Sequence, residues 1–190
     1  MSAVVIPTPL HDVLGERQTR LSIAVIAGVA VVAILATAPA LADVAVWRAL
    51  VAALLIADIG AGAVANLTQG TNDYYAARPR QRWVFIAVHV HLPCVALLLD
   101  LPLLPALLAW GMTITAAIVV NALHEHPDQR VLAGALLAAV GCALPFLPAQ
   151  QPVLLVVSAL FAAKVAYAFA VDHRGPTRTS DSPSSPPAMP

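Results

Sequence analysis

Two histidines lie two positions apart in an otherwise apolar run, FIAVHVHLPC, and they are the residues of this chain best suited to chemistry. Imidazole binds metals or transfers protons when partner groups converge on it. Positions two apart on a regular helix point about 200° away from each other, so His89 and His91 cannot both face one centre there. His91 shares the smaller face with Ala87 and Cys94, and we expect it to face the interior. In the alternative interpretation, one ring is a satisfied core residue and the other reaches a neighbouring helix or the headgroups.

Pro93 follows the two histidines and should disturb the helix that carries them. Proline has no amide hydrogen to donate to the carbonyl oxygen of His89, so that oxygen should be left free and the helix should kink. A kink could also rotate the helix and turn His89 inward in place of His91. The sequence leaves both assignments open.

A carboxylate, Asp58, lies in the stretch ADIGAGAVAN on the same helix face as Gly62 and Asn66. A charge at the centre of a membrane helix costs about 2.5 to 3.5 kcal/mol on insertion scales, so it normally faces the protein and takes a partner. Small residues on that face let another helix approach closely. Asp58 is therefore a candidate ligand, proton carrier or general base, or else a structural partner of Lys164.

A second polar group, NALHEHPDQR, ends the fourth apolar segment and is stopped by Pro127. Asn121 and His124 can lie on one helix face, and His126 follows in the turn. Clustered histidines and carboxylates can hold a divalent metal such as Zn or Fe. The spacing matches no metal motif of fixed geometry, so an ordinary polar turn is the competing interpretation.

The connection LTQGTNDYYAARPRQRW is the third polar stretch. Asn72 and Asp73 are candidate binding residues, in a hairpin that could cover a pocket as a lid. Basic and aromatic residues at a membrane edge most often anchor a helix and attract anionic lipid headgroups. We expect that role for Arg78, Arg80 and Arg82.

The composition defines the class of protein that must position these residues. The chain has 190 residues, of which 60% are hydrophobic and 11% charged, whereas soluble domains have roughly a quarter charged. This composition indicates an integral membrane protein whose first partner is the lipid bilayer. The formal net charge is zero and there is no basic block, so nothing favours nucleic-acid binding. Two cysteines form neither a disulfide framework nor a zinc-ligand spacing.

Six apolar segments are each near the length of about 20 residues that a helix needs to cross a bilayer. They are Leu21–Ala42, Trp47–Asn66, Trp83–Leu99, Leu104–Leu123, Val131–Leu147 and Val153–Val171. Backbone groups in lipid must be satisfied internally, so the segments should be helices. The sequence predicts an all-α, polytopic bundle of about six transmembrane helices over residues 21–171. A cytoplasmic segment over residues 1–20 should precede it, and a polar, proline-rich disordered tail over residues 172–190 should follow.

The first segment also resembles a secretory signal. Arg17 and Arg20 precede the apolar stretch, and Ala40-Leu41-Ala42 has the small-residue pattern of a cleavage site. Cleavage after Ala42 and retention as a helix both remain open. Neither outcome changes the orientation expected for the rest of the chain.

Basic residues predict which side each connection faces. Eight arginines fall on one side of the six segments, whereas the other side has only Arg48 and Lys164 lies within a helix. Positive residues accumulate in the cytoplasm, so we expect a multi-pass protein of the cell membrane with N- and C-termini cytoplasmic. Asp58, His89, His91 and Lys164 then lie in one layer, about 9 to 12 Å below the cytoplasmic edge.

These patterns favour a cytoplasm-facing intramembrane pocket that binds a metal or a small polar or lipid-headgroup ligand, with membrane-embedded hydrolysis as one activity. A proton-coupled small-solute transporter and a structural or accessory membrane subunit are the alternatives. The outer halves of the helices are nearly free of polar residues, which counts against a conduit. A homo-oligomer is a further candidate assembly. The candidate residues are Asp58 and His91 for catalysis; Asn66, Asn72, Asp73, Asn121 and Lys164 for binding; and His89, His91, His124 and His126 for a metal.

Overall fold

Six helices of the computed structural model are long and apolar enough to cross a membrane. They are Arg20–Ala42, Val46–Ala65, Pro79–Leu98, Leu103–Ala122, Gln129–Phe146 and Pro152–Phe169. The structure describes residues 3–124 and 126–173, and in these ranges each helix overlaps one of the six apolar segments of the sequence. The third helix begins four residues before its predicted start, because Pro79 suits the first turn of a helix. Most of the expected tail lies outside the described residues.

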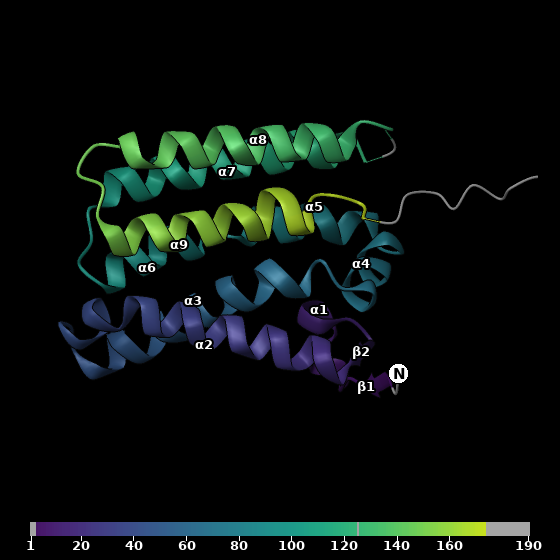
Figure 1. The fold of residues 1–190 in the computed structure, drawn as a ribbon, viewed down its shortest axis with the longest axis horizontal. Coiled ribbons are helices and arrows are strands. Elements are labelled where there is room, and N and C mark those ends of the chain that lie inside the picture. The colour runs from purple at the N-terminus through teal and green to yellow at the C-terminus, as the bar shows by residue number, and fades with distance from the viewer. Residues whose placement is uncertain (1–2, 125, 174–190) are drawn as a thin grey trace, which may run out of the picture.

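The long helices lie side by side with their axes nearly parallel, as Figure 1 shows. Several of the long helices are interrupted or extended by shorter elements, so there are more labelled helical elements than long helices. The helical elements are α2 (Arg20–Ala42), α3 (Val46–Ala65), α4 (Gln69–Ala76), α5 (Pro79–Val88), α6 (His91–Leu98), α7 (Leu103–Ala122), α8 (Gln129–Ala143), η2 (Leu144–Phe146), α9 (Pro152–Ala162) and η3 (Ala163–Phe169). The α4 helix occupies a connection that the sequence indicated as a loop.

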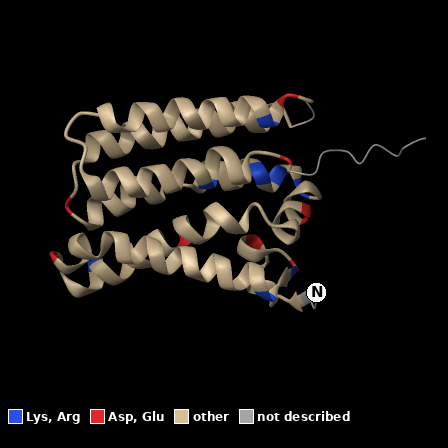
Figure 2. Ribbon diagram, viewed as in Figure 1, with Lys and Arg blue, Asp and Glu red and all other residues tan. Residues whose placement is uncertain are grey.

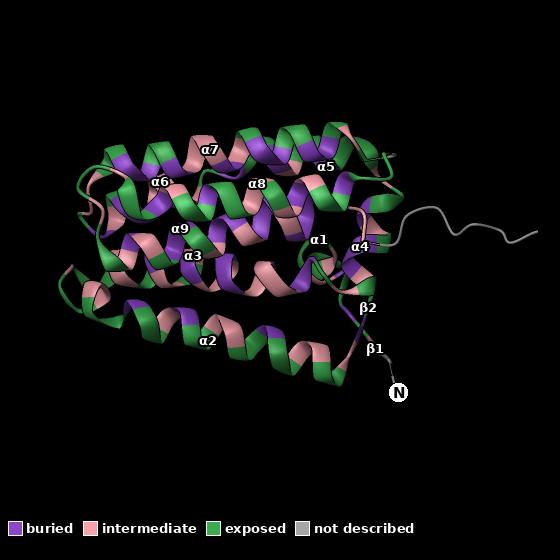
Figure 3. Ribbon diagram, turned by 45° about the horizontal axis from the view of Figure 1, so that its top comes forward, coloured by how far each residue is buried: buried purple, intermediate pink, exposed green. Residues whose placement is uncertain are grey.

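The α9 helix and its continuation η3 form the most buried of the six spans. They contact α3, α7 and α8, and their side chains Phe161, Val157 and Val165 are fully buried. By contrast, α2 is mostly exposed along its length (Figure 3). The contacts of α9 and η3 with α3, α7 and α8 make this the central helix of the bundle. η3 has π-helical geometry, a rare conformation that is often found at functional sites.

The third span is interrupted at the two histidines. α5 ends at Val88 and α6 begins at His91, so the predicted kink before Pro93 is a complete break in the helix. The carbonyl oxygen of His89, which Pro93 cannot satisfy, accepts a hydrogen bond from Trp110 Nε1 on α7 at 2.8 Å. The oxygen was expected to be left free, but Trp110 takes the place of the missing amide and satisfies it.

The N-terminal residues form a small structured segment. Strands β1 (Ala3–Val5) and β2 (Arg17–Thr19) pair antiparallel, and between them lie η1 (Thr8–Leu10) and α1 (His11–Leu14). This hairpin is the one departure from the expected all-α class within the described residues. α1 packs on α4, and Gly15 has a φ of +69° where a Cβ would lie 2.2 Å from the carbonyl carbon of Gly70. Glycine at position 15 therefore permits both the turn and the close approach.

Charged residues gather at the two ends of the bundle and are sparse along the helices (Figure 2). At the end with a single basic residue, Arg48 makes a bidentate contact with Asp100, with nitrogen–oxygen distances of 2.8 and 2.6 Å. Arg48 also donates to the carbonyl oxygen of Leu97. This contact connects the start of α3 to the turn after α6.

Candidate functional site

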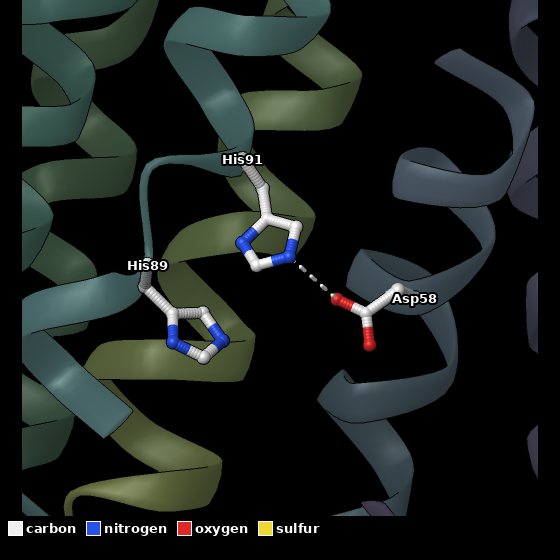
Figure 4. Close-up of side chains that lie close together, drawn as sticks. All are labelled: Asp58, His89 and His91. Atoms are coloured by element: carbon white, nitrogen blue, oxygen red, sulfur yellow. Dashed lines mark ion pairs between the residues drawn. The ribbon is translucent and has the colours of Figure 1, made fainter. Parts of the chain in front are cut away.

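Asp58, His89 and His91 form a cluster at the break in the third span. One ligand atom from each residue lies within 4.8 Å of those from the other two, and within the described residues these three form the group that could hold a metal ion. Asp58 comes from α3, His89 from the break and His91 from the first turn of α6 (Figure 4). The two rings, which a regular helix would point about 200° apart, have centroids 4.8 Å apart. The break makes this arrangement possible.

The orientation of the His89 ring is set by its neighbours. Its Nδ1 lies 2.5 Å from the carbonyl oxygen of Phe85, and because a carbonyl can only accept, Nδ1 must be the donor. The ring also lies against the Phe85 ring, with centroids 3.8 Å apart. In the neutral imidazole, Nε2 then carries the lone pair, and this atom is buried without a hydrogen-bond partner among the described residues. Metal-binding histidines typically show this pattern, with one nitrogen held by a carbonyl and the other free.

Asp58 connects His91 to Lys164. Its Oδ2 lies 3.3 Å from His91 Nε2 and 2.5 Å from Lys164 Nζ. The Lys164 side chain is only 3% exposed, whereas that of Asp58 is 33% exposed. Asp58 is therefore an ion-pair partner of Lys164, as the alternative interpretation of the sequence expected. Asp58 also belongs to the cluster with the two histidines, so the two interpretations are compatible.

The cluster lines a cavity of about 180 Å³ that also contains Gly62, Asn66, Tyr75 and Lys164. The amide nitrogen of Asn66 is buried there, and no residue in the described part of the chain forms a hydrogen bond with it. Asp12 and Val13 of α1 line the same cavity, so the N-terminal segment covers it, a role that the sequence had suggested for Asn72 and Asp73. The amide nitrogen of Asn66 therefore adds a polar atom to the cavity beyond the three candidate metal ligands.

Tyr75 joins the covering segment to the cavity wall. Its hydroxyl donates to the carbonyl oxygen of Asp12 at 2.9 Å. Burial, together with the charge of Asp12, raises the pKa of the Tyr75 phenol well above its ordinary value. The hydroxyl therefore stays protonated across the physiological range and keeps its role as donor.

Five other candidate residues lie outside the cavity. His124 and His126 are not members of the cluster within the described residues, and His126 accepts a hydrogen bond from the backbone of Asp128. Asp73 lines a separate cavity with Arg78. Asn72 donates to Asp172 and accepts from the backbone of His173, so it holds the first residues of the expected tail.

Asn121, the remaining candidate, belongs to a buried network around Arg82. Arg82 is 6% exposed; its Nε donates to Asn121 Oδ1 at 2.9 Å, and Nη2 donates to the carbonyls of Phe169 and Ala170. Gln129 donates to the same Ala170 oxygen. These donors satisfy carbonyls at the C-terminal end of η3, where a cation is favourable. The guanidinium suggested for headgroup contact is instead used inside the protein.

A signal for the burial of Arg82 is present in the sequence. Arg82, Ile86 and His89 follow the i, i+4, i+7 spacing of one helix face, and all three are buried. The sequence gives no comparable signal for the roles of Trp110 and Gln129, because each side chain donates a hydrogen bond to a carbonyl oxygen of a segment distant in the sequence.

The chain matches no protein-family model, no curated protein and no solved structure. The geometry of the site is therefore the basis for any functional assignment.

Gly62 provides a test of how tightly the cavity is built. A Cβ at this position would lie 2.5 Å from Lys164 Cε and 2.8 Å from Cδ, so Gly62→Ala should displace the lysine from Asp58. We expect a loss of about 1 to 2 kcal/mol in the free energy of unfolding, measured by thermal unfolding in detergent. Gly134→Ala is the matched control, because nothing lies within 4 Å of its Cβ. Equal stability of the two variants would show that Lys164 is not held at Asp58.

Proposed function

We propose that this chain is an integral membrane protein that binds a divalent transition metal at Asp58, His89 and His91. The observation that carries the proposal is the buried, unpartnered Nε2 of His89, on a ring whose Nδ1 is held by a carbonyl. Two imidazoles and a carboxylate are a donor set that suits Zn or Fe. Ligand atoms bound to one tetrahedral metal lie about 3.3 Å apart. The ligand atoms of the cluster lie within 4.8 Å of one another, so they would move closer by up to about 1.5 Å on binding.

Three protein ligands leave a coordination position for water or substrate, as in catalytic zinc sites. The cavity of about 180 Å³ accommodates a small group beside the cluster. Asn66 and Lys164 are the donors that would bind an oxygen of that group. This arrangement supports metal-assisted hydrolysis as the reaction class to test first.

Titration calorimetry on the purified full chain in detergent tests the proposal. We expect Zn²⁺ or Fe²⁺ to bind at one site per chain after treatment with chelator. Mg²⁺, which prefers oxygen ligands, should not bind there. Absence of Zn²⁺ and Fe²⁺ binding would contradict the proposal.

Proton-coupled transport is the second candidate, favoured by a different observation. Asp58 Oδ2 is shared by Lys164 Nζ and His91 Nε2, so three titratable groups are joined at one oxygen within the spans. Intramembrane relays in transporters are built from such groups. Solute-dependent proton uptake by proteoliposomes, together with no metal binding, would favour this candidate over the first.

The proposed orientation places the arginine-rich end in the cytoplasm, and cysteine labelling tests it. The background carries Cys94→Ala and Cys142→Ala, because both native cysteines are free. Ala76 and Gln151 are exposed at opposite ends of the bundle. An impermeant maleimide should label Gln151→Cys in intact cells and Ala76→Cys only after permeabilisation. The reverse result would overturn the cytoplasmic facing of the site.

A further inference from the structure

A second cavity, of about 590 Å³, lies between the N-terminal segment and α4 and shares no residue with the candidate metal cavity. Two cations and two anions line it: Arg17, Arg78, Glu16 and Asp73. Their formal charges sum to zero. A ligand that carries one positive and one negative group therefore fits this cavity better than a simple anion or a simple cation.

The cavity lies at the level of the lipid headgroups if the six long helices span a bilayer. Thr19 and Ser22, which line it, are at the start of α2, and Thr68 follows the end of α3. The ends of spanning helices emerge from the hydrocarbon core into the headgroup layer. The cavity is thus within reach of the polar part of a phospholipid.

Arg78 is held in position to receive a phosphate. Its Nη1 donates to the carbonyl oxygen of Tyr74 at 2.8 Å, and its guanidinium carbon lies 3.9 Å from the centroid of the Tyr74 ring. Glu16 is 3.7 Å from Nη2, with both side chains substantially exposed. Such a long, exposed ion pair contributes little by itself, so both groups can take ligand partners. Guanidinium groups bind phosphate oxygens in a bidentate way.

The cationic part of the ligand should be a primary ammonium. Glu16 and Asp73 offer carboxylates that accept its N–H groups. A quaternary ammonium has no such donors and is usually recognised by open aromatic faces. Here the face of the Tyr74 ring is already covered by Arg78.

We propose that this cavity binds the headgroup of a phosphatidylethanolamine lipid, with the phosphate at Arg78 and Arg17 and the ammonium at Glu16 and Asp73. The site is independent of the metal cluster. A bound headgroup would contact both the N-terminal segment and α4, so it would also stabilise the packing of α1 over the metal cavity.

Lipid titration of the purified full chain in detergent tests this proposal, with thermal unfolding as the readout. Phosphatidylethanolamine, phosphatidylcholine and phosphatidylglycerol of equal chain length are compared with soluble O-phosphoethanolamine. We expect the ethanolamine lipid to bind at least about fivefold more tightly than the other two lipids. Arg78→Gln should weaken binding, and Glu16→Gln should remove the preference for ethanolamine over choline. Arg80→Gln is the matched control, because Arg80 is exposed nearby but does not line the cavity.

Three results would overturn the proposal. Equal binding of the three lipids, or strongest binding of phosphatidylglycerol, would exclude a zwitterion site with a primary ammonium. Binding of O-phosphoethanolamine as tight as that of the lipid would assign the cavity to a soluble ligand instead. The substituted residues are at least partly exposed, so all variants should fold.

Discussion

Replacement of His89 by alanine is expected to weaken Zn²⁺ binding by more than about 100-fold. Changes to groups that only orient a ligand already cost about 10- to 100-fold in metal affinity, and loss of a ligand should cost more. His91→Ala should have a similar effect, because both rings lie within reach of Asp58. This expectation differs from the interpretation of the sequence, in which one ring faces the interior and the other satisfies itself locally. Calorimetry on the detergent-purified variants measures the change.

His126→Ala is the control for the histidine variants, because His126 is exposed and does not belong to the cluster. It should bind Zn²⁺ as the wild type does. Loss of binding in His91→Ala with unchanged binding in His89→Ala would remove His89 from the ligand set. Unchanged binding in both variants would mean that the histidines are packing groups.

Asp58→Ala alone is expected to be less stable than the double variant Asp58→Ala with Lys164→Met. The single change leaves the Lys164 ammonium, whose side chain is 3% exposed, without its partner at 2.5 Å. Breaking a buried pair costs about 3 to 5 kcal/mol. Asp58 is one-third exposed, so we expect about 2 to 3 kcal/mol here. Methionine at position 164 removes the charge and keeps an unbranched apolar chain, which should recover most of this loss.

Thermal unfolding of the two single variants and the double variant measures the coupling between Asp58 and Lys164. The long, exposed pair Arg78 and Glu16 is the control, and its two substitutions should combine almost additively. Strict additivity of the Asp58 and Lys164 substitutions would show that the two side chains are not partners. That result would also remove the main support for the transport alternative.

The six long apolar helices could be predicted because their signal is local. Each run of apolar residues has the length that a bilayer requires and can satisfy its backbone only as a helix. The depth of each polar residue then follows from the rise per residue, and this reasoning placed Asp58, His89, His91 and Lys164 in one layer. The structure brings these four side chains to one cavity. The loss of the helical hydrogen bond at the His89 carbonyl was equally local, since it depends only on Pro93 four positions later.

The sequence by itself thus determined the positions of the six helices and of the polar residues within them, because each depends on neighbours along the chain. The tertiary structure decided which of those residues meet. The break after Val88 allows both histidines to face Asp58. Trp110 of α7 donates the hydrogen bond that Pro93 cannot donate. Asp12 of the N-terminal segment lines the same cavity. Each of these contacts joins residues from segments that are far apart in the sequence. Which segments meet depends on how the helices pack against each other, and the spacing of residues along the chain does not reveal that packing.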